Sequence, residues 1–185
     1  IQTARKLGVP LIGLNDSAGA RIQEGLSVTT AIGKIFFENS IASGCIPQIS
    51  AIMGPCIGVG SYAPALTDFI LMVQNSSQMF ITGPAVIKEV LGETVTMEEL
   101  GGAKIHSEVS GVTDLVAKND EDCLAMIRRL LGFLPSSFES PPPHKPSHDD
   151  PNRPVDSLET IVPEDPRRAY NILQVIKAIV DDGDF

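Results

Sequence analysis

Apolar and polar residues alternate in blocks along the chain, and the blocks predict a succession of strands and helices. Short apolar runs bounded by glycine, proline or polar residues predict strands at residues 11–15, 48–53, 69–73, 79–81 and 112–116. Stretches with apolar residues three and four positions apart predict helices at residues 28–43, 85–91, 97–100 and 120–134. The alternation indicates an α/β fold.

The stretch from Pro47 to Asp68 is the centre of this pattern. An apolar strand is expected to end at Gly54-Pro55 with a turn, and a glycine-rich corner is then expected to lead into a short helix. Gly58 and Gly60 lack a Cβ atom, so a ligand can approach the backbone closely and meet N–H groups that have no partner within the helix. Such a corner suits a phosphate or the developing oxyanion of a thioester reaction.

Two other interpretations of the corner stay open. The spacing of Gly58, Gly60 and Ala63 also fits a dinucleotide-binding fingerprint. That fingerprint requires an acidic residue for the ribose, yet residues 69–87 contain neither Asp nor Glu, and Pro64 follows the corner directly. A glycine corner with a purely structural role is the second alternative. We favour the oxyanion interpretation.

Composition narrows the function classes. The net charge of −9 and the scattered basic residues argue against a nucleic-acid surface. Neither a membrane-spanning stretch nor a signal peptide is evident. The three cysteines and three histidines show no metal-like spacing, so we predict no metal and a reduced, intracellular protein.

The last fifty residues differ from the rest. Nine of the fourteen prolines fall in residues 135–166, which predicts an extended connector. Asp165 and Pro166 are expected to start a final helix with one apolar face. Because the chain opens without Met on what resembles a helix end, we expect an internal fragment of a longer polypeptide.

Five segments in order resemble one family: NDSAGARIQEG, GPCIGVGSYAPALTDF, ITGPAVIKEVLGE, ELGGAKIHSEVSGVTD and DPRRAYNILQVIKAIVDDGDF. They are similar to the carboxyltransferase (beta) subunits of biotin-dependent acyl-CoA carboxylases, the propionyl-CoA and acetyl-CoA carboxylase group. The resemblance runs nearly end to end. It implies a crotonase-like (ClpP/crotonase) fold, in which ββα units stack into a superhelix.

The resemblance also implies a domain organisation. Residues 1–134 would be the C-terminal part of the N-terminal carboxyltransferase domain, residues 135–165 a proline-rich connector, and residues 166–185 the first helix of the C-terminal domain. The intact subunits would form a homo-oligomer, a hexamer in this family. A cytoplasmic or mitochondrial-matrix location is implied, with no nucleic acid and with no membrane unless the protein belongs to a decarboxylase pump.

The activity that the resemblance implies is transfer of a carboxyl group from carboxybiotin to the α carbon of a short acyl-CoA, propionyl-CoA or acetyl-CoA. Biotin would be carried by a partner, the biotin carboxylase or biotin carrier subunit. By residue matching, Gly58 and Val59 would donate N–H groups to the thioester enolate oxygen, and Gly60 and a loop would line the site for the coenzyme A (CoA) ester. The residues of that loop are Ser17, Ala18, Gly19, Ala20 and Arg21. The family usually has glycine where this chain has Val59, so a β-branched side chain crowds the acyl group.

Other functions remain open. Biotin-dependent decarboxylases of methylmalonyl-CoA or glutaconyl-CoA carry similar subunits, and nothing in the sequence separates the two directions. A module that only binds CoA or builds an oligomer is the non-enzymatic alternative.

Several individual side chains have a structural interpretation beside the functional one. Arg21 could bind a CoA phosphate or pair with Glu24. His106 fits a hydrogen-bonded structural corner better than catalysis, and Tyr62 fits a packed ring better than a proton donor. Asp68, like Asp16, is expected to accept hydrogen bonds from backbone N–H groups.

Overall fold

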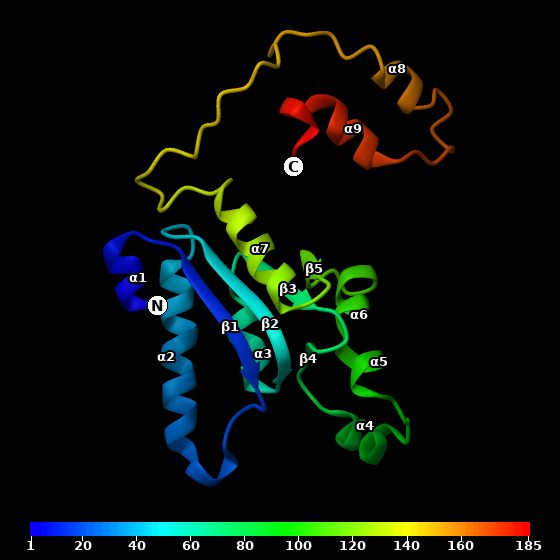
Figure 1. Ribbon diagram of the computed structural model, residues 1–185. Helices are drawn as coiled ribbons and strands as arrows, with labels where there is room; N and C mark the ends of the chain where they lie inside the picture. The colour runs from blue at the N-terminus through cyan, green and yellow to red at the C-terminus, as the bar shows by residue number, and fades with distance from the viewer. The chain divides into compact units, whose positions relative to one another are not determined.

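A computed structural model describes residues 1–185, apart from the side chain of Ile22. The chain divides into two compact units, residues 1–143 and residues 144–185 (Figure 1). Each unit is described here by itself. The first unit includes the start of the predicted proline-rich connector, and the second holds the rest of it together with the last helix. The assignment of these parts to two carboxyltransferase domains stays a prediction.

The described part of the first unit is built on a parallel sheet of five strands. The strands are β1 (Leu11–Ser17), β2 (Gln48–Ile57), β3 (Phe69–Val73), β4 (Gln78–Phe80) and β5 (Leu115–Ala117). Their order is β1-β2-β3-β5, and β4 pairs with the second half of β2. Parallel neighbours need long crossover connections, which the helices provide. The predicted α/β fold is confirmed.

Helices cover both faces of this sheet. They are α1 (Gln2–Leu7), α2 (Leu26–Ala42), α3 (Val59–Ala65), α4 (Pro84–Leu91), α5 (Met97–Gly101), α6 (Ala103–Glu108) and α7 (Asp120–Leu131), with a 3-10 turn, η1 (Ile22–Glu24). Helix α7 packs on one face of β2 and β3, where Cys123 and Ile127 meet Ile49 and Leu71 in the larger core cluster. Helix α3 lies behind the sheet on the opposite face (Figure 1).

Strand β2 does not turn at Gly54-Pro55, so that prediction is wrong. The strand continues to Ile57 and changes its neighbour on one side from β3 to β4 at this point. Its register with β1 also shifts between Asn15 and Ser17. Proline cannot donate to a ladder and therefore suits an irregularity of this kind. A Cβ on Gly54 would lie 2.6 Å from Cγ of Asp16, so glycine lets β1 and β2 stay close here.

Strands β3 and β5 begin in the same way. Asp68 accepts a hydrogen bond from the backbone N–H of Gln48 (2.8 Å) through its side chain and donates its own N–H to Gln48 O (2.9 Å). Asp114 makes the same two bonds with Ile70, at 2.7 and 2.9 Å. An aspartate directly before each strand thus joins it to its neighbour in the sheet. Asp68 joins β3 to β2, and Asp114 joins β5 to β3. The predicted role of Asp68 is confirmed, and the repeated device fits a superhelix of repeated units.

Other elements also differ from the predictions. Helix α6 was not expected, because its residues follow Gly101-Gly102; a bend at Gly102 separates it from α5. Strand β5 begins three residues later than predicted. The last helix, α9 (Ile172–Ile179), begins well after Pro166, because Asn171 caps it and accepts a hydrogen bond from Leu173 N (3.0 Å).

The second unit contains α8 (Leu158–Ile161), α9 and a short 3-10 turn, η2 (Asp181–Gly183). Asp165 does not cap a helix: it accepts the backbone N–H of Arg167 (3.0 Å) in a local turn. Ile172, Leu173 and Ile179 of α9 are exposed. In the first unit, the start of the proline-rich segment lies on the body of the fold, because Phe138 N donates to Cys45 O (3.0 Å) and Ser137 is buried.

Candidate active site

The loop after β1 and the corner after β2 line one cavity of about 590 Å³. Both lie where parallel strands end, the usual place of a site in an α/β sheet. The cavity is lined by Asn15, Ser17, Gly19, Ala20, Arg21, Glu24, Ser27, Val28, Ala31, Ile32, Ile35, Phe36, Val59, Gly60, Ala63 and Pro64. Two stretches that were predicted separately therefore meet. Ala18 belongs to the same loop but is not among the described residues that line the cavity.

The corner itself requires glycine. Gly58 has φ 59° and ψ −126°, a conformation that L residues with a side chain rarely adopt. Its N–H donates to Phe80 O of β4 (2.9 Å), and its carbonyl accepts from the N–H (3.1 Å) and the hydroxyl (2.6 Å) of Ser61. The backbone of Gly58 is thus engaged on both sides.

This engagement bears on the predicted role of Gly58. The Gly58 N–H already has an acceptor, so it does not fit the role of a donor to a ligand. The next two N–H groups, of Val59 and Gly60, donate no hydrogen bond among the described residues. Both residues line the cavity, in the first turn of α3, where N–H groups lack partners within the helix. The open donor pair is therefore shifted by one residue.

Close backbone contacts hold the loop against the corner. A Cβ on Gly60 would lie 3.0 Å from Ser17 Oγ, and a Cβ on Gly19 would lie 2.8 Å from Ile57 O. Gly19 has φ +93° and donates its N–H to Ser17 Oγ (3.2 Å). Glycine at both positions lets the two chain segments approach without space for a side chain between them.

The cavity has one charged edge and one apolar wall. Arg21 is 75% exposed and forms a loose ion pair with Glu24 at 3.8 Å. An exposed pair of this kind is worth little, so the guanidinium remains able to turn toward an anion. The structure bears out the pairing with Glu24, and phosphate binding stays a prediction.

The apolar wall comes from α2, through Val28, Ala31, Ile32, Ile35 and Phe36. Sequence analysis recognised the helical spacing of these residues but did not assign them to a site. Phe36 also meets the ring of Tyr62 edge-on, with centroids 6.0 Å apart. The ring of Tyr62 thus packs against Phe36 on one side, although the residue is 41% exposed.

A buried thiol lies beneath the corner. Cys56 is fully buried, and its Sγ lies 3.0 Å from the carbonyl oxygen of Gly60. Burial, and secondly the charge of Asp16, raises the pKa of this thiol to about 11. Cys56 is thus a protonated, packed side chain at neutral pH, as expected for an inert cysteine.

Both ring nitrogens of His106 have a hydrogen-bond partner within the protein. Nε2 lies 2.5 Å from Met79 O, and Nδ1 lies 2.8 Å from Ser110 Oγ. These contacts join α6 to β4 and to the turn that precedes β5. They support the structural interpretation of this histidine.

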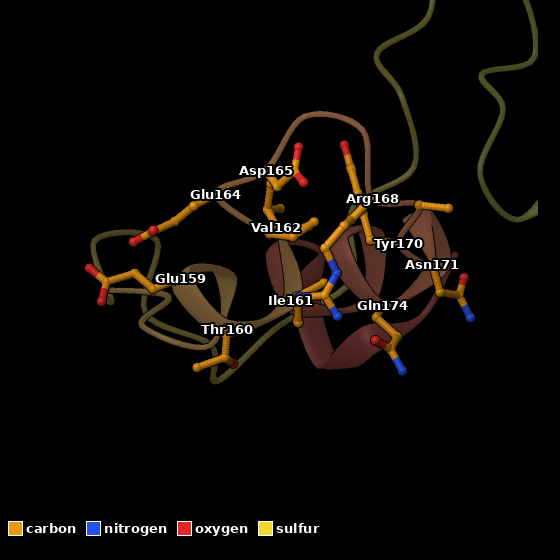
Figure 2. Close-up of a pocket in the computed structure, with 12 residues that line it drawn as sticks. Glu159, Thr160, Ile161, Val162, Glu164, Asp165, Arg168, Tyr170, Asn171 and Gln174 are labelled. Carbon is orange, nitrogen blue, oxygen red and sulfur yellow. The ribbon is translucent and has the colours of Figure 1, made fainter.

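A second hollow lies in the second unit, between α8 and the start of α9 (Figure 2). Its volume is about 730 Å³, and Arg168 extends across it toward Ile161. Most of the lining residues are exposed, and none of the predicted site residues lies in it. It is an open surface between loop and helix, so the cavity of the first unit is the better candidate site.

Fold and cavity together define an α/β protein with a cavity at the carboxyl ends of parallel strands and two open N–H donors in it. Over residues 1–185 the chain matches the family described as carboxyl transferase domain, and it belongs to that family. Within the described residues, no helix combines the length and the apolar character that a bilayer crossing requires.

Named relatives point to two related activities. The chain is 56% identical over 182 residues to the methylmalonyl-CoA decarboxylase subunit alpha of Veillonella parvula, covering 98% of this chain and 36% of that one. It is 51% identical over 179 residues to the mitochondrial propionyl-CoA carboxylase beta chain of Mus musculus, covering 97% and 33%. The chain therefore spans about a third of the length of these relatives.

A solved structure agrees in fold. The transcarboxylase 12S core, described as a hexamer with methylmalonyl-CoA and its hydrolysis product, matches with a TM-score of 0.90 and 44% identity, over 99% of this chain and 35% of that one. The predicted family and the predicted crotonase-like fold class are confirmed.

Proposed function

We propose that this chain forms the acyl-CoA side of a biotin-dependent carboxyltransferase site. The observation that carries the proposal is the pair of open N–H groups of Val59 and Gly60 at a cavity that also has an apolar wall and a cationic edge. Family membership and the acyl-CoA enzymes among the relatives support it.

In this proposal the thioester oxygen of the substrate accepts hydrogen bonds from Val59 and Gly60. Removal of the α proton places negative charge on that oxygen, and fixed N–H donors stabilise this charge more than they stabilise the neutral carbonyl. The electron pair of the enolate then forms the new bond from the α carbon to the carboxyl carbon. This proton transfer requires no side chain of the cavity as a base, because the proton would go to the biotin nitrogen. The Arg21 guanidinium at the edge would hold a CoA phosphate, and α2 would contact the apolar part of the ester.

Carboxybiotin, brought by a partner protein, would release its carboxyl group as carbon dioxide when the N–C bond breaks, and the ureido nitrogen, which keeps the electron pair of that bond, would take the α proton. The thioester oxygen would occupy the open N–H donors of Val59 and Gly60 at the corner. The ureido oxygen would take its donors from another part of the protein. This division of the site fits a chain that spans about a third of its relatives. We accordingly propose a biotin carrier partner and a hexameric whole protein, in the cytoplasm or the mitochondrial matrix.

The reverse reaction is the second candidate. Two methylmalonyl-CoA decarboxylase alpha subunits are 56% and 52% identical to this chain, as similar as the propionyl-CoA carboxylase chains. The same two N–H donors would stabilise the same enolate when methylmalonyl-CoA loses its carboxyl group. Direct comparison of propionyl-CoA carboxylation with methylmalonyl-CoA decarboxylation by the complete protein decides between them.

Val59→Pro in the complete subunit tests the proposed donor. Val59 is the first residue of α3, where proline fits a helix and removes only the N–H. Gly58, having no Cβ, tolerates the following proline at ψ −126°. Loss of one oxyanion donor typically lowers kcat by roughly 10²–10³-fold.

Val59→Ala is the matched control, because it shortens the side chain and keeps the N–H. We expect nearly unchanged kcat in this variant and an intact assembly in both, measured by carboxyl transfer to propionyl-CoA and by sedimentation. Normal turnover by an assembled proline variant would refute the donor role of Val59.

A further inference from the structure

The thiol of Cys56 occupies a particular place in the hydrogen bonding of the corner. In a regular helix the carbonyl of Gly60 accepts the N–H four residues later, which would be that of Pro64. Proline has no N–H, so this carbonyl lacks the regular donor four residues later in α3. The Cys56 Sγ lies 3.0 Å from it and replaces the missing donor.

We propose that Cys56 is a positioning residue for the carboxyltransferase reaction: its S–H group fixes the first turn of α3, so that the N–H groups of Val59 and Gly60 stay directed into the cavity. This inference rests on the proposed function. Cys56 does not touch the substrate in this arrangement and acts only through the Gly60 carbonyl.

The surroundings explain why a single weak donor matters here. Gly58 is anchored through its N–H to Phe80 O and through its carbonyl to Ser61, which fixes the start of the turn. The Cys56 contact holds the carbonyl of Gly60, two residues after Gly58. The Gly60 carbonyl belongs to the peptide whose N–H, that of Ser61, donates to Gly58 O, so the two contacts hold this peptide at both of its polar groups. We expect the first turn, which carries the N–H groups of Val59 and Gly60, to loosen when the Cys56 contact is lost. Preorganised donors are what distinguish oxyanion stabilisation from ordinary solvation.

The protonation state suits this role. Burial in the core cluster with Ile52, Ile70 and Met72, together with the charge of Asp16, raises the pKa of the thiol. The group therefore keeps its proton, and with it the ability to donate, throughout the neutral range. A thiolate at this place would repel the developing oxyanion and could not donate to Gly60.

The test uses the complete subunit with two probe pairs: methylmalonyl-CoA with free biotin as carboxyl acceptor, and propionyl-CoA with carboxybiotin as carboxyl donor. We expect Cys56→Ala to lower kcat about tenfold, with KM for the CoA ester changed less than twofold, because the lost alignment matters mainly in the transition state. Cys56→Ser keeps a donor and should restore kcat to within about twofold of wild type.

Pro64→Ala supplies the discriminating background. It gives Gly60 an intrahelical N–H partner, so Cys56→Ala should cost little when both changes are combined. A merely structural role of Cys56 in packing would make the two changes additive, whereas the proposal requires strong coupling. Additive effects, wild-type kcat in Cys56→Ala or failure of serine to rescue would each overturn it.

A spectroscopic readout covers the case in which Cys56→Ala does not fold. Isotope-edited infrared spectra of the wild-type protein should show the S–H stretch of Cys56 shifted to low frequency by its acceptor. An unshifted band would overturn the proposal. A wild-type subunit that transfers no carboxyl group to or from either probe would instead refute the proposed function, so the two failures are distinguishable.

Discussion

Gly19→Ala is the sharpest test of how the loop and the corner form one cavity. Gly19 lies in the loop after β1 with φ +93°, and a Cβ there would lie 2.8 Å from the backbone oxygen of Ile57. The clash involves the main chain at the end of β2, so no side chain can turn away to relieve it. The loop has to move out from the corner that follows Ile57.

Two costs combine in this variant. A residue with a Cβ at positive φ costs roughly 1–3 kcal/mol, and relief of overpacking costs a similar amount. We therefore expect the free energy of unfolding of the complete subunit to fall by about 3 kcal/mol. Because Ser17 and Arg21 move with the loop, we also expect KM for the CoA ester to rise at least tenfold.

Gly33→Ala is the matched control. Gly33 lies within α2, nothing lies within 4 Å of its added Cβ, and it does not line the cavity. Alanine in a helix interior is favoured over glycine by roughly 0.5–1 kcal/mol, so this variant should be slightly more stable with unchanged kinetics. Urea unfolding and acyl-CoA saturation curves measure both effects. A Gly19→Ala variant as stable as wild type, with the same KM, would refute the close approach of loop and corner.

Three further predictions concern stability, thiol reactivity and amide exchange. Asp68→Ala and Asp114→Ala should each lower the free energy of unfolding by about 1–3 kcal/mol, because each leaves a strand N–H unpaired. Asn at either position should cause a smaller loss. Urea unfolding measures these losses, and Ala variants as stable as wild type would contradict the role of the two aspartates in joining the strands. In native protein at pH 8, iodoacetamide should modify Cys45 well before Cys56, because burial raises the pKa of the Cys56 thiol to about 11 and holds it protonated; mass spectrometry reports the order, and a reversal would contradict the assigned burial. Amide exchange should be faster at residues 141–149 than in α7, because no helix or strand of the described chain lies between α7 and α8. Comparable protection of the two segments would contradict this expectation.

Sequence reasoning found the corner because glycine spacing marks it locally. Two glycines after an apolar strand predict a sharp entry into a helix, and the structure has that entry at Gly58. What the sequence could not show is which N–H groups remain open. The acceptor of the Gly58 N–H is Phe80 O, on a strand that pairs with β2 far along the chain. Only the pairing of β2 with β4 reveals that the open pair begins at Val59.

The apolar stripe of α2 shows a second limit. Val28, Ile32, Ile35 and Phe36 have the spacing of a face that packs into a core. In the structure these residues line the cavity, and Ile35 is 43% exposed. The spacing of apolar residues shows which side of a helix is apolar. It does not show whether that side packs into the core or lines a cavity. Likewise Gly54-Pro55 reads as a turn by local preference, and the neighbouring strands β1 and β4 hold it extended instead.

The corner after β2 would serve one of the two substrates in the proposed reaction. On the proposed function, transfer of a carboxyl group from carboxybiotin to an acyl-CoA requires stabilisation of the thioester oxygen and of the ureido oxygen, and the corner at Val59 and Gly60 would supply donors for one of them. The first unit contains one such corner in the described chain, at the end of β2, where a glycine precedes a helix and a cavity lies beside it. A second corner of the same kind, from another copy of the fold, is the simplest source of the other donors. Because the two substrates must meet within bonding distance, the two corners would have to face each other across a shared, dry space. The apolar wall of α2, at one side of this cavity, is then the surface that would exclude water from it.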